Sequence, residues 1–434
     1  MTTTVQHSTT PRYDGAPTPQ TATDLLIVGA SQSGVQLAVS LRALGFDGHI
    51  TLLGDEDHRP YQRPALSKEF LQDKVTSESL IFRSNDYWVD NNITLVKNER
   101  IEDVQRKPNE GDGIAIGRSG TTYPYRRIAL TVGASPRRLE VPGADLNGVV
   151  YLRNADDALL LKDLVPEATD VVVVGGGFIG LEAAASLQEL GKNVTVLEHG
   201  PKLIGRAVGE QTSQYFLDRH LARGLDIRLE ARIEQLLDDQ GSVRAVQLEN
   251  GEEIPAQIVL VGIGVIPNTQ LAERLGLEID NGIVVDSHAI ASDGTTIVVG
   301  DVANMPNPVP GAPPGDRIRM ESVNNAIEHA KVAAYSLMGR SEEYAGIPWF
   351  WSNQADMKLQ IAGLSHGYDH TVVRHDIERG KFSVLYYRDN QIIAADCVNA
   401  PLDFMAVRQA LSQGKNIDAE TAADVSAILK KLIG

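Results

Sequence analysis

Apolar residues twice form a short continuous run along the chain, and each run leads into a glycine-rich turn and then into a helical pattern. The first segment begins at Asp24 and reads DLLIVGASQSGVQLAVSLRALGFDGHITLLGDE; the second begins at Asp170 and reads DVVVVGGGFIGLEAAASLQELGKNVTVLEHG. The run from Val171 to Val174, apolar at every position, is typical of a strand buried on both faces of a parallel sheet. Each segment therefore predicts a strand, a helix and a second strand, which together form a βαβ unit.

Outside the two repeats the pattern predicts short strands, and the segment ESVNNAIEHAKVAAYSLMG predicts a helix that ends at Gly339. ITLV and GIAI predict strands between the two repeats, and VRAVQLENG and EEIPAQIVLVGIG predict strands after the second repeat. From about Gly346 the pattern changes to hairpin-like strands, and the tail has a helical spacing of Val425, Ile428 and Leu432 that we expect to close a core. These signals predict a separate α+β domain at the C-terminus.

Composition narrows the classes of protein to which the chain can belong. Its 434 residues suggest about three domains, and 40 Lys and Arg against 57 Asp and Glu give a net charge of −17, which argues against a nucleic-acid-binding protein. The single cysteine, Cys397, excludes an internal disulfide, a CxxC redox pair and a thiolate metal cluster. The chemistry must therefore come from another group.

No feature of the sequence indicates a membrane or secretory protein. No apolar run approaches the roughly 18 residues that span a bilayer, and the N-terminus lacks the basic and apolar regions of a signal peptide. Its Thr, Pro, Gln and Ser content predicts a disordered arm over residues 1–22. We therefore expect a cytoplasmic protein with an ordered body that begins near Asp24.

The second glycine-rich turn has the spacing of a dinucleotide-binding fingerprint. Gly175, Gly177 and Gly180 form GxGxxG directly after a predicted strand and at the start of a predicted helix. The first glycine permits a tight turn, the second lets the backbone approach a pyrophosphate at the helix N-terminus, and the third lets helix and strand pack closely. Glu198, at the end of the next predicted strand, can accept hydrogen bonds from both ribose hydroxyls, which favours NADH over NADPH, although His199 could carry a positive charge. The alternative is a glycine-rich turn of purely structural use.

The first turn follows the same pattern less closely, with positions Gly29, Ser31, Ser33 and Gly34. Ser31 replaces the middle glycine, but it is small enough for close approach and its hydroxyl can reach a phosphate. Asp55 is the expected ribose contact, shifted by one position; the alternative is that Asp55 and Glu56 only solvate a loop. Two such folds in one chain indicate two dinucleotides, and FAD with NADH is the economical pair because a hydride passes between them.

The whole pattern resembles the FAD-dependent NAD(P)H–ferredoxin reductases that serve cytochrome P450 and aromatic-ring dioxygenase systems, the putidaredoxin reductase and rhodocoxin reductase type. The resemblance runs from about Asp24 to the end and is carried by PYQRPALSKEFL, VVGGGFIGLEAAA, VGIGVIPN, IVVGDVA, RMESVNNA and PWFWSNQ. It implies an α/β fold with two Rossmann-like dinucleotide-binding domains, as in glutathione reductase, and a C-terminal α+β domain. The implied domains are FAD-binding over 23–133, NADH-binding over 134–261, FAD-binding again over 262–344, and a C-terminal reductase domain over 345–434.

Carried over position by position, the resemblance implies two sets of cofactor contacts. The FAD contacts would be Gly29, Ser31, Ser33, Gly34, Asp55, Arg63, Lys68, Ile101, Arg153, Asp301 and Val323. The NADH contacts would be Gly175, Gly177, Gly180, Glu182, Glu198, Gly264 and Glu321. The sequence departs from the family at Thr131-Val132-Gly133, where the family has Ala-Thr-Gly, at Ser135, where it has Arg, and at Asn324, where Pro or Gln is commoner. The first two departures put local flavin or pyrophosphate contacts in question, whereas Asn324 is a minor change.

The resemblance also implies a reaction without an acid–base triad, in which NADH reduces FAD and electrons pass singly to a [2Fe–2S] ferredoxin. Lys68 is the polar residue expected near flavin N5, paired with Glu182; the alternative is an exposed lysine in the first turn of a helix. Trp349 and Trp351 are expected on opposite sides of an extended segment, one against the flavin edge and the other packed. The alternative for Trp351 is a core residue of the C-terminal domain.

Three other functions share this fold and lack the disulfide. They are rubredoxin reductase, monodehydroascorbate reductase and, in a different class, an NADH-sensing interaction protein of the apoptosis-inducing-factor kind. The PWFWSNQ segment favours the ferredoxin reductase. A ferredoxin partner is usually acidic, so its docking patch would be a basic minority on a negative surface, with the P450 or ring-hydroxylating oxygenase reached only through the ferredoxin.

Overall fold

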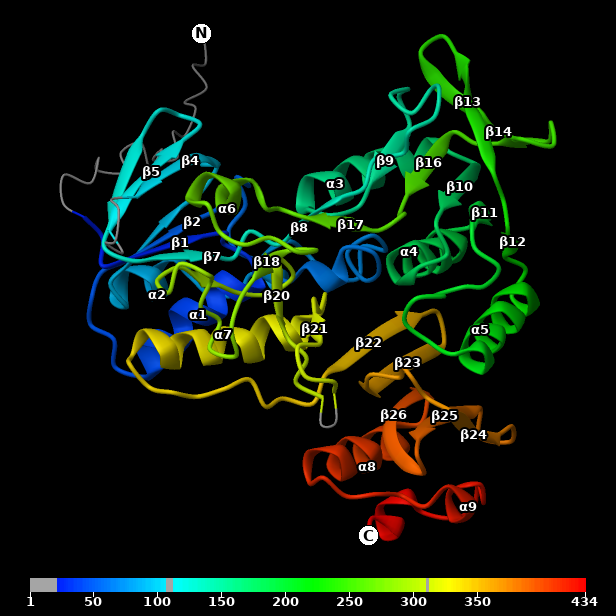
Figure 1. Cartoon of the computed structure of the whole chain (residues 1–434). Coiled ribbons are helices and arrows are strands. Elements are labelled where there is room, and N and C mark those ends of the chain that lie inside the picture. The colour runs from blue at the N-terminus through cyan, green and yellow to red at the C-terminus, as the bar shows by residue number, and fades with distance from the viewer. Residues whose placement is uncertain (1–21, 107–111, 310–311) are drawn as a thin grey trace, which may run out of the picture.

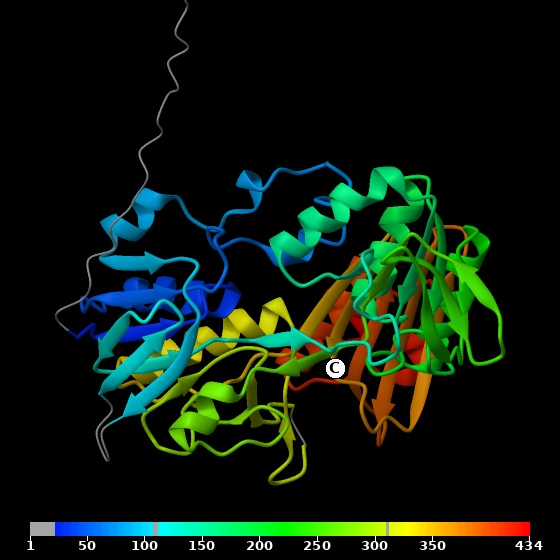
Figure 2. The ribbon, with the colours of Figure 1, turned by 90° about the horizontal axis from the view of Figure 1, so that it is seen from above.

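The computed structural model describes residues 22–106, 112–309 and 312–434, and the N-terminal arm expected over 1–22 lies, except for its last residue, outside this range. Two lobes, each built on a parallel sheet, stand side by side, and a third unit lies beneath the second lobe (Figure 1). Seen from above, the strands of this third unit lie directly against the second lobe (Figure 2).

The first lobe is built on a five-stranded parallel sheet with the order β19-β7-β1-β2-β3. Its strands are β1 (Leu25–Val28), β2 (Ile50–Leu53), β3 (Ile93–Val96), β7 (Ile128–Leu130) and β19 (Ile297–Val298). Helices α1 (Gln32–Ala43) and α7 (Val323–Leu337) cover one face, and the antiparallel strands β4 (Ile101–Arg106), β5 (Gly113–Gly117) and β6 (Thr122–Tyr125) cover the other. A short helix, α2 (Asn85–Asp90), precedes β3.

The second lobe repeats this plan with the strand order β12-β11-β10-β16-β9. Its strands are β9 (Val149–Tyr151), β10 (Asp170–Val174), β11 (Asn193–Leu197), β12 (Asp226–Arg228) and β16 (Ile258–Val261). One face carries α3 (Ala155–Leu164), α4 (Phe178–Glu189) and α5 (Glu210–Ala222), and the other carries β13 (Ile233–Asp239), β14 (Ser242–Leu248) and β15 (Glu253–Pro255).

The valine run explains why β10 is central. Val171 and Val173 pack into the core beneath the helices, whereas Val172 and Val174 pack against the antiparallel strands. Successive side chains of a strand point to opposite faces, so a strand covered on both faces must be apolar at every position. The prediction of a doubly buried strand is confirmed.

Two segments cross between the lobes and pair with each other as β8 (Ala134–Pro136) and β17 (Val265–Pro267). After the second crossing the chain returns to the first lobe and forms α6 (Gln270–Leu275), β18 (Ile283–Val284), β20 (Ala303–Pro306) and β21 (Arg317–Ile318) before α7. The first sheet therefore contains strands that precede the second lobe in the sequence and one strand, β19, that follows it.

The C-terminal unit is an antiparallel sheet with the order β22-β23-β26-β25-β24, followed by helices. Its elements are β22 (Trp349–Gln354), β23 (Met357–Gly363), β24 (His370–Asp376), β25 (Lys381–Arg388), β26 (Gln391–Val398), α8 (Pro401–Ser412) and α9 (Ala419–Ala422). One face packs on α8 and the tail, and the other joins the core of the second lobe. The predicted fold class, with two Rossmann-like domains and a C-terminal α+β unit, is confirmed.

The tail does not form the helix that its apolar spacing predicted. Val425 and Ile428 are exposed, and only a short 3-10 turn forms at Leu429–Leu432. The buried guanidinium of Arg374 donates to the carbonyl oxygens of residues 422, 424, 425 and 427. A helix would use these carbonyls for its own hydrogen bonds, so the long-range contact with Arg374 replaces the local pattern.

The C-terminal sheet meets the N-terminus of α5 through a buried phenol. The backbone amide of Gly209 donates to the Tyr386 hydroxyl at 3.0 Å, and this hydroxyl donates to the carboxyl of Asp396. Asp396 is fully buried, and burial raises its pKa to about 6, although the hydrogen bond from Tyr386 works in the opposite direction. The carboxyl is therefore more easily protonated in the folded chain than in the unfolded chain.

The stability of the fold should consequently fall as pH rises from 4 to 6. A group whose pKa is raised in the folded state stabilises that state fully below the unfolded pKa and loses this contribution as pH passes the folded pKa. For Asp396 a shift of roughly two units corresponds to about 3 kcal/mol. The side chain of Asp396→Asn stays neutral at every pH, so the variant should not show this loss. Its free energy of unfolding, measured by chemical denaturation, should therefore rise relative to that of the wild type between pH 4 and 7. Parallel pH profiles for the two proteins would contradict this assignment.

Candidate functional site

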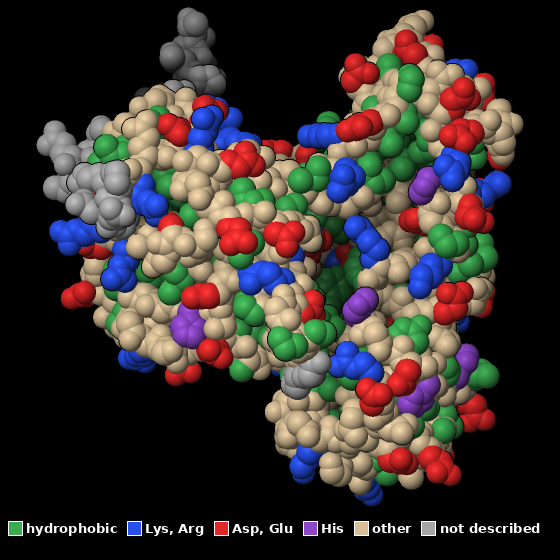
Figure 3. All heavy atoms as spheres, viewed as in Figure 1, with side chains coloured by type: hydrophobic (Ala, Val, Ile, Leu, Met, Phe, Trp, Pro, Cys, Tyr) green, Lys and Arg blue, Asp and Glu red, His purple; other side chains and the backbone are tan. Residues whose placement is uncertain are grey.

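A deep cleft of about 2040 Å³ lies between the two lobes and reaches β22 of the C-terminal unit. In Figure 3 it is the hollow near the centre of the molecule, with Lys and Arg side chains along its edges. Pockets for small ligands usually measure about 300–1,000 Å³. This cleft is therefore large enough for two dinucleotides.

The charge of the cleft differs from that of the whole chain. Ten cationic side chains line it: Arg59, Arg63, Lys68, Arg100, Arg138, Arg153, Lys202, Arg206, Arg274 and Arg319. Nine acidic side chains balance them: Asp55, Glu56, Glu99, Glu102, Asp157, Glu182, Glu198, Asp301 and Glu321. A chain with a net charge of −17 thus presents a nearly neutral cleft, which lowers the electrostatic cost of bringing in anionic pyrophosphates.

The two glycine-rich turns open into this cleft from opposite lobes. Gly29 and Gly175 have φ values of +117° and +110°, and a Cβ at either would overlap a backbone carbonyl. A Cβ at Gly34 or Gly180 would overlap the turn itself, so these glycines are required by packing. A Cβ at Gly177 would meet no atom within 4 Å and would stand in the cleft.

The open space beside Gly177, which the other glycines of the turns lack, is where a pyrophosphate would have to fit. The first helical residue after Gly177 is Phe178, so the open space lies at the N-terminus of α4, where unpaired N–H groups favour an anion. In the first lobe the residue before helix α1 is Ser31, which corresponds to Gly177 before α4. The Ser31 hydroxyl accepts a hydrogen bond from Arg63 Nε at 3.0 Å. The residues present fit a pyrophosphate at each turn.

The carboxylate of Glu198 is held in place by the backbone. It follows β11 and accepts from the amides of Gly176 at 2.7 Å and Gly200 at 2.6 Å. In the first lobe Gly54 occupies the corresponding position, because Gly29 bonds Leu53 just as Gly175 bonds Leu197. A side chain at Gly54 would crowd Ala30, so an acid can stand only at the next position, which is the exposed, cleft-lining Asp55.

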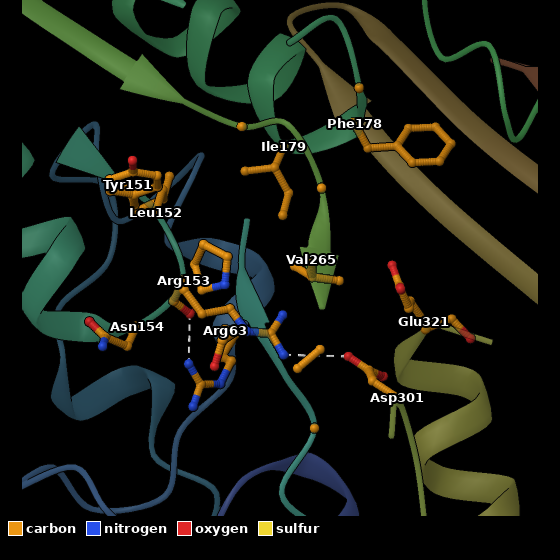
Figure 4. A pocket seen from close by; sticks show the side chains of 18 of the residues that line it. Arg63, Tyr151, Leu152, Arg153, Asn154, Phe178, Ile179, Val265, Asp301 and Glu321 are labelled. Atoms are coloured by element: carbon orange, nitrogen blue, oxygen red, sulfur yellow. Dashed lines mark hydrogen bonds and ion pairs between the residues drawn. The ribbon is translucent and has the colours of Figure 1, made fainter. Parts of the chain in front are cut away.

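Glu56 has a different role from the loop-solvating one considered for it. It accepts from Tyr61 Oη at 2.6 Å and forms an ion pair with Arg63. Arg63 also donates to the carbonyl of Arg153 at 2.6 Å, and Arg153 points toward Asp301 (Figure 4). Sequence reasoning missed Glu56 because nothing local shows which arginine it meets.

Asp301 and Glu321 approach the cleft from the returning part of the first lobe (Figure 4). Asp301 lies 3.5 Å from Arg153 Nη2; burial raises the pKa of this carboxyl, while Arg153 opposes the shift. Arg319, which the sequence did not single out, pairs with Glu321 at 2.5 Å and donates to the Asp301 carbonyl at 3.0 Å.

All the predicted site residues line the cleft except Gly34, which lies beneath its turn. The residues that line it include Ile101, Val323, Ser33 and Gly264.

Lys68 and Glu182 form a buried ion pair at the floor of the cleft. The ammonium donates to Glu182 Oε2 at 2.6 Å, and the side chains are only 12% and 7% exposed. Ser67 donates to the same oxygen at 2.6 Å, and Ser352 of β22 donates to Oε1 at 2.7 Å. The alternative of an exposed lysine is therefore wrong, and sequence reasoning missed both serines.

The expectation that Trp349 and Trp351 face opposite sides is wrong. Their ring centroids lie 5.5 Å apart, because side chains two positions apart in a strand share one face. Both indoles line the cleft, and Trp349 also packs against Phe404 of α8. Phe350, between them, turns the other way and packs on Phe178 at 4.5 Å.

The two departures from the family pattern at the crossovers make hydrogen bonds of their own. Thr131 Oγ1 donates to the carbonyl of Gly29 at 2.8 Å, so it supports the first glycine-rich turn. Ser135 donates to Asn268 at 2.7 Å and joins the two crossover segments. Both residues therefore have partners within the protein.

No group of three or more His, Cys, Asp or Glu is placed to hold a metal ion in residues 22–106, 112–309 and 312–434. Over the same ranges no helix is both long and apolar enough to cross a bilayer.

Comparison with known proteins agrees with the geometry. The sequence model of the family described as pyridine nucleotide-disulphide oxidoreductase matches residues 23–333, and one described as reductase C-terminal matches 349–433. Rhodocoxin reductase of Rhodococcus erythropolis is 39% identical over 94% of each chain. A rubredoxin-NAD(+) reductase of Ectopseudomonas oleovorans is 37% identical over 87% of this chain and 96% of its own. In the solved covalent putidaredoxin reductase–putidaredoxin complex, the matching chain superimposes with a TM-score of 0.89 at 34% identity, over 95% of this chain and 98% of its own.

The glycines of the second turn should respond differently to the same substitution. Gly177→Ala adds a methyl group to open space in the cleft, so the fold and FAD content should persist while NADH binds at least about tenfold more weakly. Gly180→Ala forces the turn apart and should lower the melting temperature. Titration with NADH and thermal unfolding would separate the two effects. Unchanged NADH affinity in Gly177→Ala would remove this glycine from the binding site.

Proposed function

Because the chain belongs to the pyridine nucleotide-disulphide oxidoreductase family, we propose that it is an NADH-dependent ferredoxin reductase. Its electrons would pass through FAD to a [2Fe–2S] ferredoxin that serves a cytochrome P450 or a ring-hydroxylating oxygenase. The observation that carries the proposal is the cleft, where two glycine-rich turns from different lobes face one space and a buried Lys–Glu pair forms its floor.

The single cysteine supports this choice within the family. Cys397 is fully buried in β26, and burial raises the pKa of its thiol. A lone buried thiol cannot form a redox disulfide and is a poor nucleophile. The electrons must therefore leave to a separate acceptor, as they do in ferredoxin reductases.

The chemistry that FAD supplies when bound is acceptance of a hydride from NADH and release of electrons one at a time. The first glycine-rich turn, Arg63 and Arg153 would hold its phosphates, with Asp55 at the ribose and Asp301 at the ribityl chain. The Gly175–Gly180 turn would hold the NADH pyrophosphate, and Glu198 the adenosine ribose. Lys68, oriented by Glu182, would donate a hydrogen bond toward the reacting ring, and Trp351 would shield the ring edge from water.

Because rubredoxin reductase, monodehydroascorbate reductase and the NADH-sensing interaction protein share this fold, the electron acceptor is the question to test. The purified protein should be yellow and should bleach with NADH. Cytochrome c reduction should become rapid only when a [2Fe–2S] ferredoxin is added. Stronger stimulation by rubredoxin would instead assign a rubredoxin reductase, and reduction of the monodehydroascorbate radical would assign a monodehydroascorbate reductase. NADH-dependent association without turnover would assign an interaction protein.

Replacing Lys68 should slow the reduction of FAD by NADH. Because Lys68→Ala alone leaves Glu182 as an unpaired buried carboxylate, the informative variant is the double change Lys68→Met, Glu182→Gln. Loss of a positioned charged donor should reduce the stopped-flow rate by about 10- to 100-fold.

Lys97→Met provides the matched control, since its ion pair with Asp57 at 3.0 Å is exposed and lies outside the cleft. This variant should reduce FAD at the wild-type rate. An unchanged rate in the double variant would exclude Lys68 from the reaction.

A further inference from the structure

A row of hydrogen bonds leads from the floor of the cleft into the interior. Lys68 Nζ lies 2.6 Å from Glu182 Oε2, and Ser352 Oγ lies 2.7 Å from Glu182 Oε1. The Gln354 Nε2 atom lies 3.2 Å from Ser352 Oγ, and Gln354 Oε1 lies 2.8 Å from His220 Nε2. The row thus extends two residues beyond the contacts already described, along β22 to helix α5.

The chemistry of these groups fixes the direction of every bond in the row. Glu182 accepts from Lys68 at Oε2, and as the carboxylate of an ion pair it has no proton to donate to Ser352 at Oε1. Ser352 must therefore donate its hydroxyl proton to Glu182 and accept from the Gln354 amide nitrogen. This places the Gln354 carbonyl toward His220, which must then donate from Nε2. All three donors point along the row toward Glu182.

The far end of the row is deeply buried. Ser352, Gln354 and His220 are each fully buried, and His220 Nδ1 has no hydrogen-bond partner among the described residues. Burial lowers the pKa of His220; the hydrogen bond with Gln354 opposes this shift, and Arg223 adds to it. A neutral imidazole has a single N–H, and here the geometry assigns it to Nε2.

We propose that Ser352, Gln354 and His220 are positioning residues that act together on the Lys68–Glu182 pair. This inference rests on the proposed function, in which Lys68 faces the flavin. Aligned donors polarise one another in a medium of low dielectric constant, so the row supports more negative charge on Glu182 than Ser352 alone would. The row keeps the carboxylate of Glu182 turned toward Lys68. The positive ends of the aligned donors also offset part of the negative charge of Glu182 that the flavin would experience.

The loss of this row should make the flavin harder to reduce. In Ser352→Ala the charge on Glu182 is no longer offset by a donor at Oε1, so the local potential becomes more negative. We expect the ratio of reduced to oxidised FAD at a fixed potential to fall about tenfold, which corresponds to about 30 mV for a two-electron couple. The rate of FAD reduction by NADH, measured with ferricyanide as the acceptor, should fall at least about tenfold.

Conservative variants separate positioning from packing. Ser352→Thr keeps the hydroxyl and should have the wild-type flavin potential and rate of FAD reduction. His220→Phe removes the donor and should lower both quantities, whereas His220→Gln can donate from the same place and should retain them. Ser383→Ala is the matched control: this buried serine of the same sheet donates to Asp403 at 3.0 Å, away from Glu182. It should change neither the potential nor the rate.

The tautomer of His220 gives a readout that does not depend on turnover. With ¹⁵N-labelled histidine, and with His220→Gln to assign the signal, the ring should carry its proton on Nε2 in the wild type and lose this strict preference in Gln354→Leu. A proton fixed on Nδ1, or a Ser352→Ala protein with an unchanged potential, would overturn the inference. If the flavin potential, the rate of FAD reduction and the His220 tautomer are as expected but no ferredoxin stimulates the reaction, only the proposed electron acceptor is contradicted.

Discussion

The carboxylate of Glu182 is the one charge on which the arrangement of the three parts of this molecule depends. Burying an unpaired carboxylate costs several kcal/mol, and breaking a buried pair costs about as much. The donors that satisfy Glu182 come from Ser67 and Lys68 in the first lobe and from Ser352 in the C-terminal sheet, between 114 and 170 residues away in the chain. The carboxylate accepts all three hydrogen bonds only when the three parts are docked, so their docking completes the site.

The features predictable from the sequence are those that a short segment determines by itself. Val171 to Val174 must lie in a strand covered on both faces, and the glycines at 175 and 180 are where a side chain would overlap the backbone. The strand, the glycine spacing and the following helix together predict both nucleotide folds, and they are the basis for proposing a pyrophosphate at each turn. The reason for the one-residue shift of Asp55 is visible only in the structure, where a side chain at Gly54 would crowd Ala30 of the first turn.

What the sequence does not reveal is which distant side chains meet. Nothing near Glu56 indicates its pairing with Arg63, and nothing in the tail indicates that the carbonyls of residues 422 to 427 bond to Arg374 rather than to one another. Where such a contact exists it overrides the local apolar spacing, as the exposed Val425 shows. The error over Trp351 was of another kind: the period of a strand, applied correctly, already places it beside Trp349.

The distribution of charge and the single thiol together constrain how electrons can leave. The net charge of −17 comes entirely from residues outside the cleft, because inside it the cationic and acidic side chains nearly balance. Since Cys397 is buried away from the cleft, no dithiol relay connects the flavin to an acceptor under the proposed function. Transfer of single electrons needs proximity but no covalent bond, so the cleft can serve any iron–sulfur protein that docks close enough. Under the proposed function, charge and shape of the docking surface would therefore select the partner, whereas the chemistry inside the cleft would stay the same.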